Sequence, residues 1–476
     1  MERAQQQRFS FTTLMAMVVG SMVGAGIFSL PQAFGRATGP FGAIFAWAIA
    51  GVGMLMLAFI FQTLSRRKPE LDAGIYAYAK AGFGNYLGFL SALGYWSAAL
   101  LGNVSYFVLI KSTLGLFFPV FGDGNTVVAV VVSSILLWTM HVMILRGIRE
   151  AAALNRIVTF AKIIPILLFI VVVGFAFDAE IFAANFWGGE EVSFQSVAGQ
   201  VRATMLVTVF VFVGIEGASV YSRYARNRGD VGLATLLGFL GVLCLLVLVT
   251  ILSYGVLLRP DLAALRNPSM AGVLEAVVGP WGAVFVSVGL LISVGGAYLS
   301  WVLLAAEILF SASKDETMPR FLAHENRNGV PSSALWLTNL VVQVFLVLTL
   351  FAEYAFTLAL ELTSSMILIP YFLVAAYALK LVWTGETYGA DPEGRRNDFF
   401  RAAIAVIYTA GLIYAAGAKH LVLSAAIYGP GTILYLIARR EQNRQAFAKA
   451  ETLVFAVAAI GAVIAILGLL TGRITV

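Results

Sequence analysis

Apolar residues fill thirteen long segments of this chain, and polar residues gather in the short stretches between them. Each segment is long enough to cross a bilayer as a helix, which takes roughly 20 apolar residues. The apolar residues are continuous and do not alternate with polar ones, so transmembrane helices are predicted and a transmembrane barrel is not. The predicted spans lie near residues 11–34, 41–64, 84–110, 125–145, 155–177, 198–222, 232–257, 280–312, 333–351, 355–379, 399–418, 420–438 and 450–471.

The composition agrees with an all-α polytopic membrane protein. Of the 476 residues, 60% are hydrophobic and only 12% are charged, whereas about a quarter are charged in a typical soluble protein. The first ten residues are polar and the first apolar run has full span length, so we expect no cleaved signal peptide. The single cysteine, Cys244, excludes an intrachain disulfide.

The lysines and arginines distinguish the two sides of the membrane. With the N-terminus in the cytoplasm, 23 of the 31 cationic residues fall on cytoplasmic segments and seven fall outside. This asymmetry is typical of membrane proteins in that orientation. An odd number of spans then places the C-terminus outside. The remaining cation, Lys162, lies inside span 5.

Small residues interrupt the first and sixth spans. The segment VVGSMVGAGIF (18–28) holds three glycines and a serine, although glycine inside a helix costs about 1 kcal/mol relative to alanine. The segment FVFVGIEGAS (210–219) again places glycines in mid-span, now on both sides of Glu216. The alternative explanation for either segment is that small residues permit close helix packing.

The positions of these two interruptions predict internal symmetry. Each opens a block of five spans, and matching breaks in two halves are typical of transporters built from inverted repeats. Broken backbone at membrane depth must line a cavity, where free amides can hold a carboxylate and free carbonyls an ammonium. These two poles suit an α-amino acid. The repeats are predicted at 1–178 and 197–382, with C-terminal helices at 398–476.

The two interrupted segments resemble those of a known family. GSMVGAGIFSLP (20–31) and GIEGAS (214–219) look like the two signature segments of the amino acid–polyamine–organocation superfamily, and the likeness extends over about residues 8–440. Within it, the chain is most similar to the bacterial basic amino acid/polyamine antiporters, especially those that exchange arginine for ornithine. The resemblance implies a LeuT-like fold of five plus five inverted repeats, with helices 1 and 6 broken, that works by alternating access.

The resemblance assigns the two ends of an amino-acid substrate to particular residues. The carboxylate is assigned to Met22, Ala25 and Gly26, and the amino group to the carbonyls of Phe210 and Val213. Ala25 stands where a relative has serine, so the backbone amides must do more of the binding. Phe210 stands where that relative has a tryptophan that acts as an outer gate.

Glu216 is the strongest individual candidate, because an ionisable group inside a span is costly and usually functional. The family places it in a gate with two tyrosines, which correspond to Tyr95 and Tyr371 here. The alternative is a carboxylate bonded to its neighbours for packing. Trp301 matches a tryptophan beneath the relative's cationic substrate, where an indole face attracts a cation. An isolated tryptophan in a span is also a common interface anchor.

The same resemblance assigns the head group of the substrate's side chain to Ala98, Ala99, Asn103 and Thr363. Asparagine and threonine also join helices in membranes, which is the alternative for the last two. Lys162 matches a lysine that takes the place of sodium in some superfamily members. The resemblance implies that Lys162 holds the first half-helix of this chain near Gly20 and Ser21. Its alternative is a side chain extended to the cytoplasmic face.

The resulting expectation is a secondary active antiporter that exchanges extracellular L-arginine for intracellular L-ornithine across a bacterial inner membrane. The alternatives are a lysine or polyamine (agmatine or putrescine) antiporter and a proton-coupled importer of cationic amino acids. No cluster of metal ligands and no nucleophile–base pattern stands out, so neither an enzyme, a cofactor nor a metal site is expected. The formal charge of +6 is no sign of nucleic-acid binding here. The expected partners are the substrates, the lipid bilayer and a second copy in a homodimer.

Overall fold

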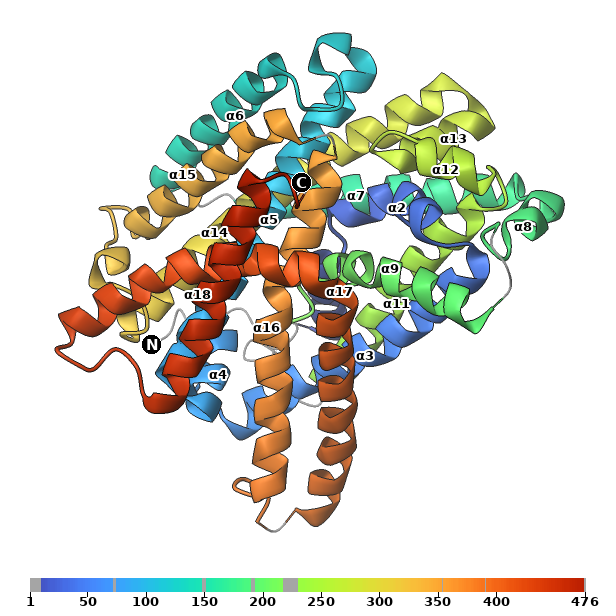
Figure 1. Ribbon diagram of the computed structural model, residues 1–476. Helices are drawn as coiled ribbons and strands as arrows, with labels where there is room; N and C mark the ends of the chain where they lie inside the picture. The colour runs from blue at the N-terminus through green and yellow to red at the C-terminus, as the bar shows by residue number, and fades with distance from the viewer. Residues whose placement is uncertain are drawn as a thin grey trace. The chain divides into compact units, whose positions relative to one another are not determined.

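The computed structural model describes residues 10–71, 74–147, 151–189, 193–216, 230–352, 354–389 and 391–474. These residues form helices joined by short turns, and no β-strand occurs among them (Figure 1). Ten of the described helices are long and apolar enough to cross a membrane, or up to twelve if each of two bent pairs counts as one span. The prediction of an all-α polytopic membrane protein is confirmed.

The chain folds into two compact units, each built from three separate stretches. Unit 1 consists of Met1–Asp72, Thr159–Ser293 and Val374–Gly411, and unit 2 of Ala73–Val158, Val294–Leu373 and Leu412–Val476. Each unit therefore draws on both predicted repeats and on the C-terminal helices. The repeat boundaries at 1–178, 197–382 and 398–476 concern internal symmetry and stay predictions.

The helices divide between these units as follows. Unit 1 holds α1 (Phe11–Met22), η2 (Ala25–Ser29), α2 (Leu30–Ala37), α3 (Pro40–Arg67), α8 (Ala179–Asn185), α9 (Phe194–Phe212), α11 (Asp230–Ser253), α12 (Arg259–Ala264) and α13 (Ser269–Val278). Unit 2 holds α4 (Ile75–Phe83), α5 (Asn85–Phe117), η3 (Pro119–Phe121), α6 (Val127–Leu145), η5 (Arg320–Ala323), α15 (Ser332–Leu348), η6 (Thr349–Phe351) and α18 (Lys449–Leu470). Four helices contribute residues to both units: α7 (Ala151–Phe175), α14 (Pro280–Lys314), α16 (Ala355–Thr384) and α17 (Pro392–Glu441).

The helix bounds depart from the predicted spans mainly at polar ends. Helix α5 runs to Phe117 and α16 to Thr384, past the predicted ends at 110 and 379. The sequence shows the apolar middle of each span. The helix continues past this apolar middle for as long as its main-chain hydrogen bonds continue. The short helices α4, α8, α12 and α13 lie outside the predicted spans, because none of them needs a span's length of apolar residues.

Predicted spans 11 and 12 both fall within α17, which has 50 residues. This helix leaves helical geometry at Gly417 (φ 72°, ψ 170°), at the junction between the two predicted spans. A φ in the left-handed region is easily adopted by glycine and by few other residues. The kink at Gly417 therefore divides α17 into two segments, which correspond to the two predicted spans.

The predicted break in the first span is confirmed. Helix α1 ends at Met22, Val23 and Gly24 are not helical, and the chain resumes with η2 and α2 at an angle of 46°. Gly24 is extended, with φ −112° and ψ −157°. The break lies within the glycine-rich segment, which agrees with the low helix propensity of glycine.

The second half of this span is held by the connection after α11 in unit 1. The Gln32 amide donates to the Ser269 hydroxyl at 3.1 Å, and Asn267 donates to the Gln32 side chain at 2.8 Å. The guanidinium of Arg36 donates to the Ala263 carbonyl at 3.0 Å. Residues 259–278 thus fix α2, which continues directly from the break.

In unit 2, helix α5 is the most buried span and packs against α4, α15 and α6. Helices α6 and α15 lie side by side along one face of this unit (Figure 1). Buried polar groups join these helices. Trp96 donates to the Thr338 hydroxyl at 3.0 Å, and the Tyr298 hydroxyl donates to Asn339 at 3.1 Å.

Candidate functional site

The break in the first span exposes the start of a new helix. Ala25 and Gly26 are the first two residues of η2, and Gly24 before them provides no side-chain cap. The first amides of any helix have no carbonyl partner within that helix. Met22, at the end of α1, and Ala25 are buried, with exposed fractions of 2% and 1%. The three residues assigned to the carboxylate therefore lie together at this buried helix start.

Gly26 lies against the end of α9. A Cβ atom added at Gly26 would come within 2.7 Å of Val211 Cγ1 and 2.8 Å of Phe210 Cδ1. No side chain fits there without displacing its neighbours. The structure therefore brings together Gly26 and Phe210, two residues that the sequence analysis assigned to opposite ends of one substrate.

The sixth span stops being helical at the predicted place. Helix α9 ends at Phe212, and residues 213–216 form a turn in which Gly214 has φ +109°. In a continuous helix the Gly214 amide would donate to the Phe210 carbonyl. It donates instead to the Glu216 carboxylate, at 3.1 Å. The Phe210 carbonyl accepts a long bond of 3.4 Å from the Val213 amide, and a carbonyl oxygen has a second lone pair for another donor. The continuation at 217–229 lies outside the described residues.

Glu216 is buried at the end of this turn, with an exposed fraction of 5%. Its bond to the Gly214 amide holds the turn in place, so the residue has a structural role. A carboxylate has about four lone-pair positions, and one amide uses only one of them. The predicted gating role of Glu216 is compatible with this geometry and stays a prediction.

Lys162, on α7, binds the other side of the first break. Its ammonium donates to the carbonyl of Gly20 at 2.7 Å and to that of Val23 at 2.9 Å. In a continuous helix these carbonyls would accept from residues 24 and 27. The side chain is 4% exposed, so it does not extend to the aqueous face. The expected contact with Gly20 is present, whereas Ser21 donates to the Val18 carbonyl of its own helix.

The remaining candidates lie in unit 2. Tyr95, Ala98, Ala99 and Asn103 are buried on α5, and Thr363 and Tyr371 are buried on α16. The two helices touch beside these residues: a Cβ added at Gly102 would lie 3.8 Å from the Thr363 methyl carbon. Trp301 lies on α14, far from both ends of that helix, and is half-buried.

Asn103 is the most unusual of these side chains. It is fully buried, yet neither its Nδ2 nor its Oδ1 forms a hydrogen bond with any described residue. Buried amides are nearly always bonded, because an unsatisfied polar group is costly. Thr363 donates to the Ala359 carbonyl at 2.7 Å, so its oxygen remains an acceptor. Both groups can therefore accept hydrogen bonds from a cationic head group.

Two polar contacts escaped the sequence analysis. Glu361 on α16 binds the ring of His420 on α17, with 2.9 Å between Oε2 and Nε2. In unit 1, Asp398 is 3% exposed and accepts from Arg67 and Arg401, each at 3.2 Å. Glu361 is recognisable as a carboxylate inside an apolar run, but its partner is far along the chain. Only the fold pairs them.

Comparison with known proteins places this geometry in a family. The model of the amino acid permease family matches residues 9–437. A protein of Pseudomonas aeruginosa named as an arginine/ornithine antiporter is 55% identical, with 100% of both chains covered. A protein of Corynebacterium glutamicum named as an L-lysine transport protein is 40% identical, covering 99% of this chain and 97% of its own. An arginine/agmatine antiporter of Chlamydia felis is 39% identical, covering 97% and 96%.

The family match includes both interrupted spans and nearly every helix described above. The resemblance based on the two glycine-rich segments is thereby confirmed. With the match extending over most of its length, the chain belongs to the amino acid permease family.

Proposed function

We propose that this chain is a secondary active antiporter that exchanges extracellular L-arginine for intracellular L-ornithine by alternating access. The observation that carries the proposal is the 55% identity, over the whole of both chains, to the Pseudomonas aeruginosa protein named as an arginine/ornithine antiporter. The relatives named for lysine and for arginine/agmatine are less similar, at 40% and 39%. Exchange of arginine for ornithine is therefore favoured over the lysine and agmatine alternatives.

The proposed architecture is LeuT-like, with two inverted repeats and thirteen spans. This count treats each bent pair as one span and α17 as two, divided at Gly417. The proposed location is a bacterial inner membrane, with the N-terminus in the cytoplasm and the C-terminus outside. The concentration of 23 of the 31 lysines and arginines on one set of segments supports this orientation.

Main-chain groups at the two helix breaks are proposed to recognise the part shared by all α-amino acids. The amides at Ala25 and Gly26, beside Met22, provide the positive end of a helix for the carboxylate. The carbonyls of Phe210 and Val213 provide acceptors for the ammonium. Because Ala25 carries no hydroxyl, this recognition uses main-chain groups almost entirely.

Residues on α5, α14 and α16 are proposed to recognise the side chain of the substrate. Asn103 and Thr363 present neutral acceptors for a guanidinium or ammonium, and Ala98 and Ala99 leave room for it. Trp301 provides an aromatic face, which attracts a cation by about 0.5–2 kcal/mol. No carboxylate belongs to this set, so each contact is weak. Weak contacts suit an exchanger, because the product must leave as readily as the substrate enters.

Gating is assigned to Tyr95, Phe210, Glu216 and Tyr371, and Lys162 is proposed to replace a sodium ion. An ammonium that already holds the Gly20 and Val23 carbonyls removes the need for a metal cation there. Exchange should then proceed without sodium. One-for-one exchange follows if an empty carrier reorients more slowly than an occupied one.

Radiolabelled arginine uptake into proteoliposomes tests this function. Vesicles filled with ornithine should take up arginine many times faster than empty vesicles, and protein-free vesicles provide the background. Equal rates in filled and empty vesicles would reject antiport. Uptake into empty vesicles driven by an imposed proton gradient would favour the proton-coupled importer.

Substrate preference requires a second measurement. Unlabelled arginine, ornithine, lysine, agmatine and putrescine should be compared as competitors of labelled arginine. Arginine and ornithine should compete best if this proposal is right. Strong competition by agmatine or putrescine would favour the polyamine alternative, since neither has a carboxylate for the amides at 25 and 26.

A further inference from the structure

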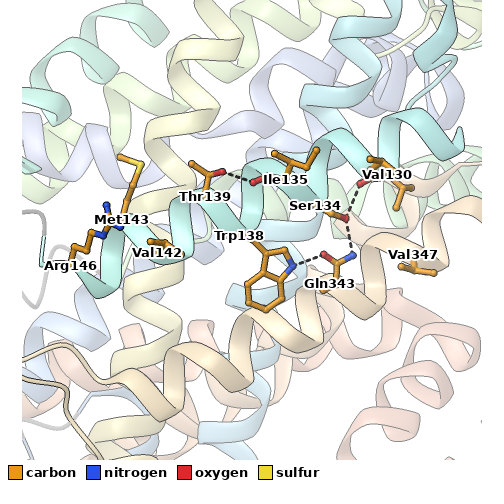
Figure 2. Close-up of a pocket in the computed structure, with 11 residues that line it drawn as sticks. Val130, Ser134, Ile135, Trp138, Thr139, Val142, Met143, Arg146, Gln343 and Val347 are labelled. Carbon is orange, nitrogen blue, oxygen red and sulfur yellow. Dashed lines mark hydrogen bonds between the residues drawn. The ribbon is translucent and has the colours of Figure 1, made fainter.

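A groove runs between α6 and α15 in unit 2. It has a volume of about 820 Å³ and extends along α6 from Val130 to Arg146 (Figure 2). At 1.5 Å per helical residue, this distance is about 24 Å. One leaflet of the hydrocarbon core is about 15 Å deep, half of roughly 30 Å. The groove can therefore hold an acyl chain along its whole length.

The rims of the groove are apolar and exposed. Val131 and Ile135 on α6 are 51% and 63% exposed, and Val347 on α15 is 43% exposed. Both helices have the length and composition of membrane spans. Exposed apolar side chains on such helices face lipid unless another protein covers them.

The polar side chains within the groove bond to one another. Trp138 donates to Gln343 at 3.1 Å, and Gln343 donates to the Ser134 hydroxyl at 2.9 Å (Figure 2). Ser134 in turn donates to the Val130 carbonyl at 2.8 Å. Thr139 donates to the carbonyl of Ile135 at 2.7 Å. Because each of these side chains already takes part in a hydrogen bond, an apolar chain can lie over them at a reduced desolvation cost.

Arg146 is different from the other lining residues. It lies at one end of the groove, opposite Val130 and Val347 (Figure 2). Its side chain is exposed, and the guanidinium forms no hydrogen bond or ion pair with a described residue. Only its main-chain amide donates, to the carbonyls of Val142 and Met143 at the end of α6. A guanidinium matches a phosphate in charge and in the geometry of its donors. The groove thus combines an apolar channel with a cation at one end.

We propose that this groove binds one anionic phospholipid, with an acyl chain between α6 and α15 and the phosphate at Arg146. None of the proposed substrate residues lines this groove. In the orientation proposed above, Arg146 is cytoplasmic, so the lipid belongs to the inner leaflet. The bound lipid would fill the space between two helices of unit 2 and stabilise their contact.

A second copy of this chain is the less favoured occupant. Two copies related by an axis along the membrane normal would place both Arg146 side chains at the same depth. If the groove were their contact, the two like charges would lie at the same depth and repel each other. An anionic lipid would neutralise the charge of Arg146, whereas a second copy would add a second positive charge.

Native mass spectrometry of the purified full-length protein tests the proposal. The protein is equilibrated with equal amounts of phosphatidylglycerol and phosphatidylcholine of the same acyl chains. Wild type should retain phosphatidylglycerol with a preference of about fivefold, which equals roughly 1 kcal/mol for one cation beside an anionic headgroup. The Arg146→Gln variant should lose the preference. Arg66→Gln, which removes another exposed arginine near the end of a span, should keep it.

Two further variants distinguish the possible results. Ile135→Trp narrows the groove and should reduce the retained amount of both lipids while leaving Arg146 in place. A preference that survives in Arg146→Gln, or lipid retention unchanged in Ile135→Trp, would overturn the proposal. An Ile135→Cys variant in a Cys244→Ser background reports on the second copy. Rapid disulfide-linked dimer formation in membranes would assign the groove to a homodimer.

Discussion

The ammonium of Lys162 donates a hydrogen bond of 2.7 Å to the carbonyl oxygen of Gly20. The bond joins α7 to the last turn of α1, just before the helix breaks. Interrupting a helix frees carbonyls that must find other donors, and a cation is favoured at a helix C-terminus. One side chain thus supplies both the donors and the charge that the break requires.

Replacing Lys162 with methionine should destabilise the break and abolish exchange. Methionine has a similar length but no donor, so the carbonyls of Gly20 and Val23 lose their partner. An unsatisfied buried acceptor costs about 1–3 kcal/mol, and the melting temperature of the purified protein should fall. Wild-type exchange should be equal in sodium and choline media, as measured by arginine uptake into ornithine-filled vesicles.

Lys111 provides a matched control for this variant. It is another buried lysine, 1% exposed, and it donates to the Thr349 hydroxyl at 2.9 Å. Lys111→Met should lower stability yet retain sodium-independent exchange. If Lys162→Met exchanged arginine as fast as Lys111→Met, the proposed role of Lys162 at the break would be wrong.

Two glycines of the first span should respond in opposite ways to alanine. At Gly26, a Cβ would come 2.7 Å from Val211 and 2.8 Å from Phe210. Such overpacking typically costs about 1–3 kcal/mol. At Gly20, a Cβ would meet no atom within 4 Å, and alanine is better than glycine in a helix by about 1 kcal/mol. Gly26→Ala should therefore lower the melting temperature and impair exchange, whereas Gly20→Ala should be tolerated. Similar melting curves for the two variants would contradict this.

Two substitutions of Glu216 should distinguish its structural role from its electrostatic role. Glutamine keeps an oxygen that can accept from the Gly214 amide, whereas alanine removes it. Glu216→Ala should abolish exchange, and Glu216→Gln should preserve the melting temperature of wild type while still failing to exchange. Normal exchange in Glu216→Gln would show that the bond to Gly214, and not the negative charge, is what transport requires.

Asn103 should illustrate a conflict between stability and function. Its amide is fully buried without a described hydrogen-bond partner, so replacing it with leucine removes a polar group that gains little in the folded state. Asn103→Leu should melt at the same temperature as wild type or higher. The same variant should raise the KM for arginine, because an acceptor for the guanidinium is lost. A lower melting temperature with unchanged KM would make Asn103 a packing residue.

The sequence was sufficient to predict the helical class and the first break. Both follow from local properties: apolar runs define the spans, and glycines at 20, 24 and 26 define where a helix ends. The termination of α9 near Gly214 was predictable for the same reason. Propensity and hydropathy belong to short segments, so an isolated sequence shows them.

Apart from the contact of Lys162 with Gly20, which the family resemblance implied, contacts between distant segments were beyond the sequence. Nothing near Lys162 indicates that it binds Val23, and nothing near Asp398 indicates two arginines around it. The residues assigned to substrate came from family resemblance, because asparagine and threonine inside a span are ordinary packing residues as well. Pairing depends on packing, and packing depends on the whole fold.

Asp398 and Asp391 allow a comparison between a buried and an exposed partner of the same arginine. Asp398 also accepts from the Tyr388 hydroxyl at 3.1 Å, and Arg67 donates to Asp391 at 2.8 Å. A hydrogen bond to a charged group typically contributes about 1.5–3 kcal/mol, and the buried Asp398 accepts several of them. Asp398→Ala should therefore lower the melting temperature strongly at neutral pH, and Asp391→Ala should change it little.

Acid should weaken the exposed pair between Arg67 and Asp391. The hydrogen bond from Arg67 holds the pKa of Asp391 below its usual value of 3.8. A lowered pKa in the folded state means that the pair stabilises the protein above about pH 4 and ceases to do so as the pH falls through the folded-state pKa. Melting curves between about pH 3 and pH 7 should show a smaller acid-induced drop in Asp391→Asn than in wild type. An identical drop in both proteins would mean that Asp391 does not contribute to acid sensitivity, and that other carboxyl groups cause it.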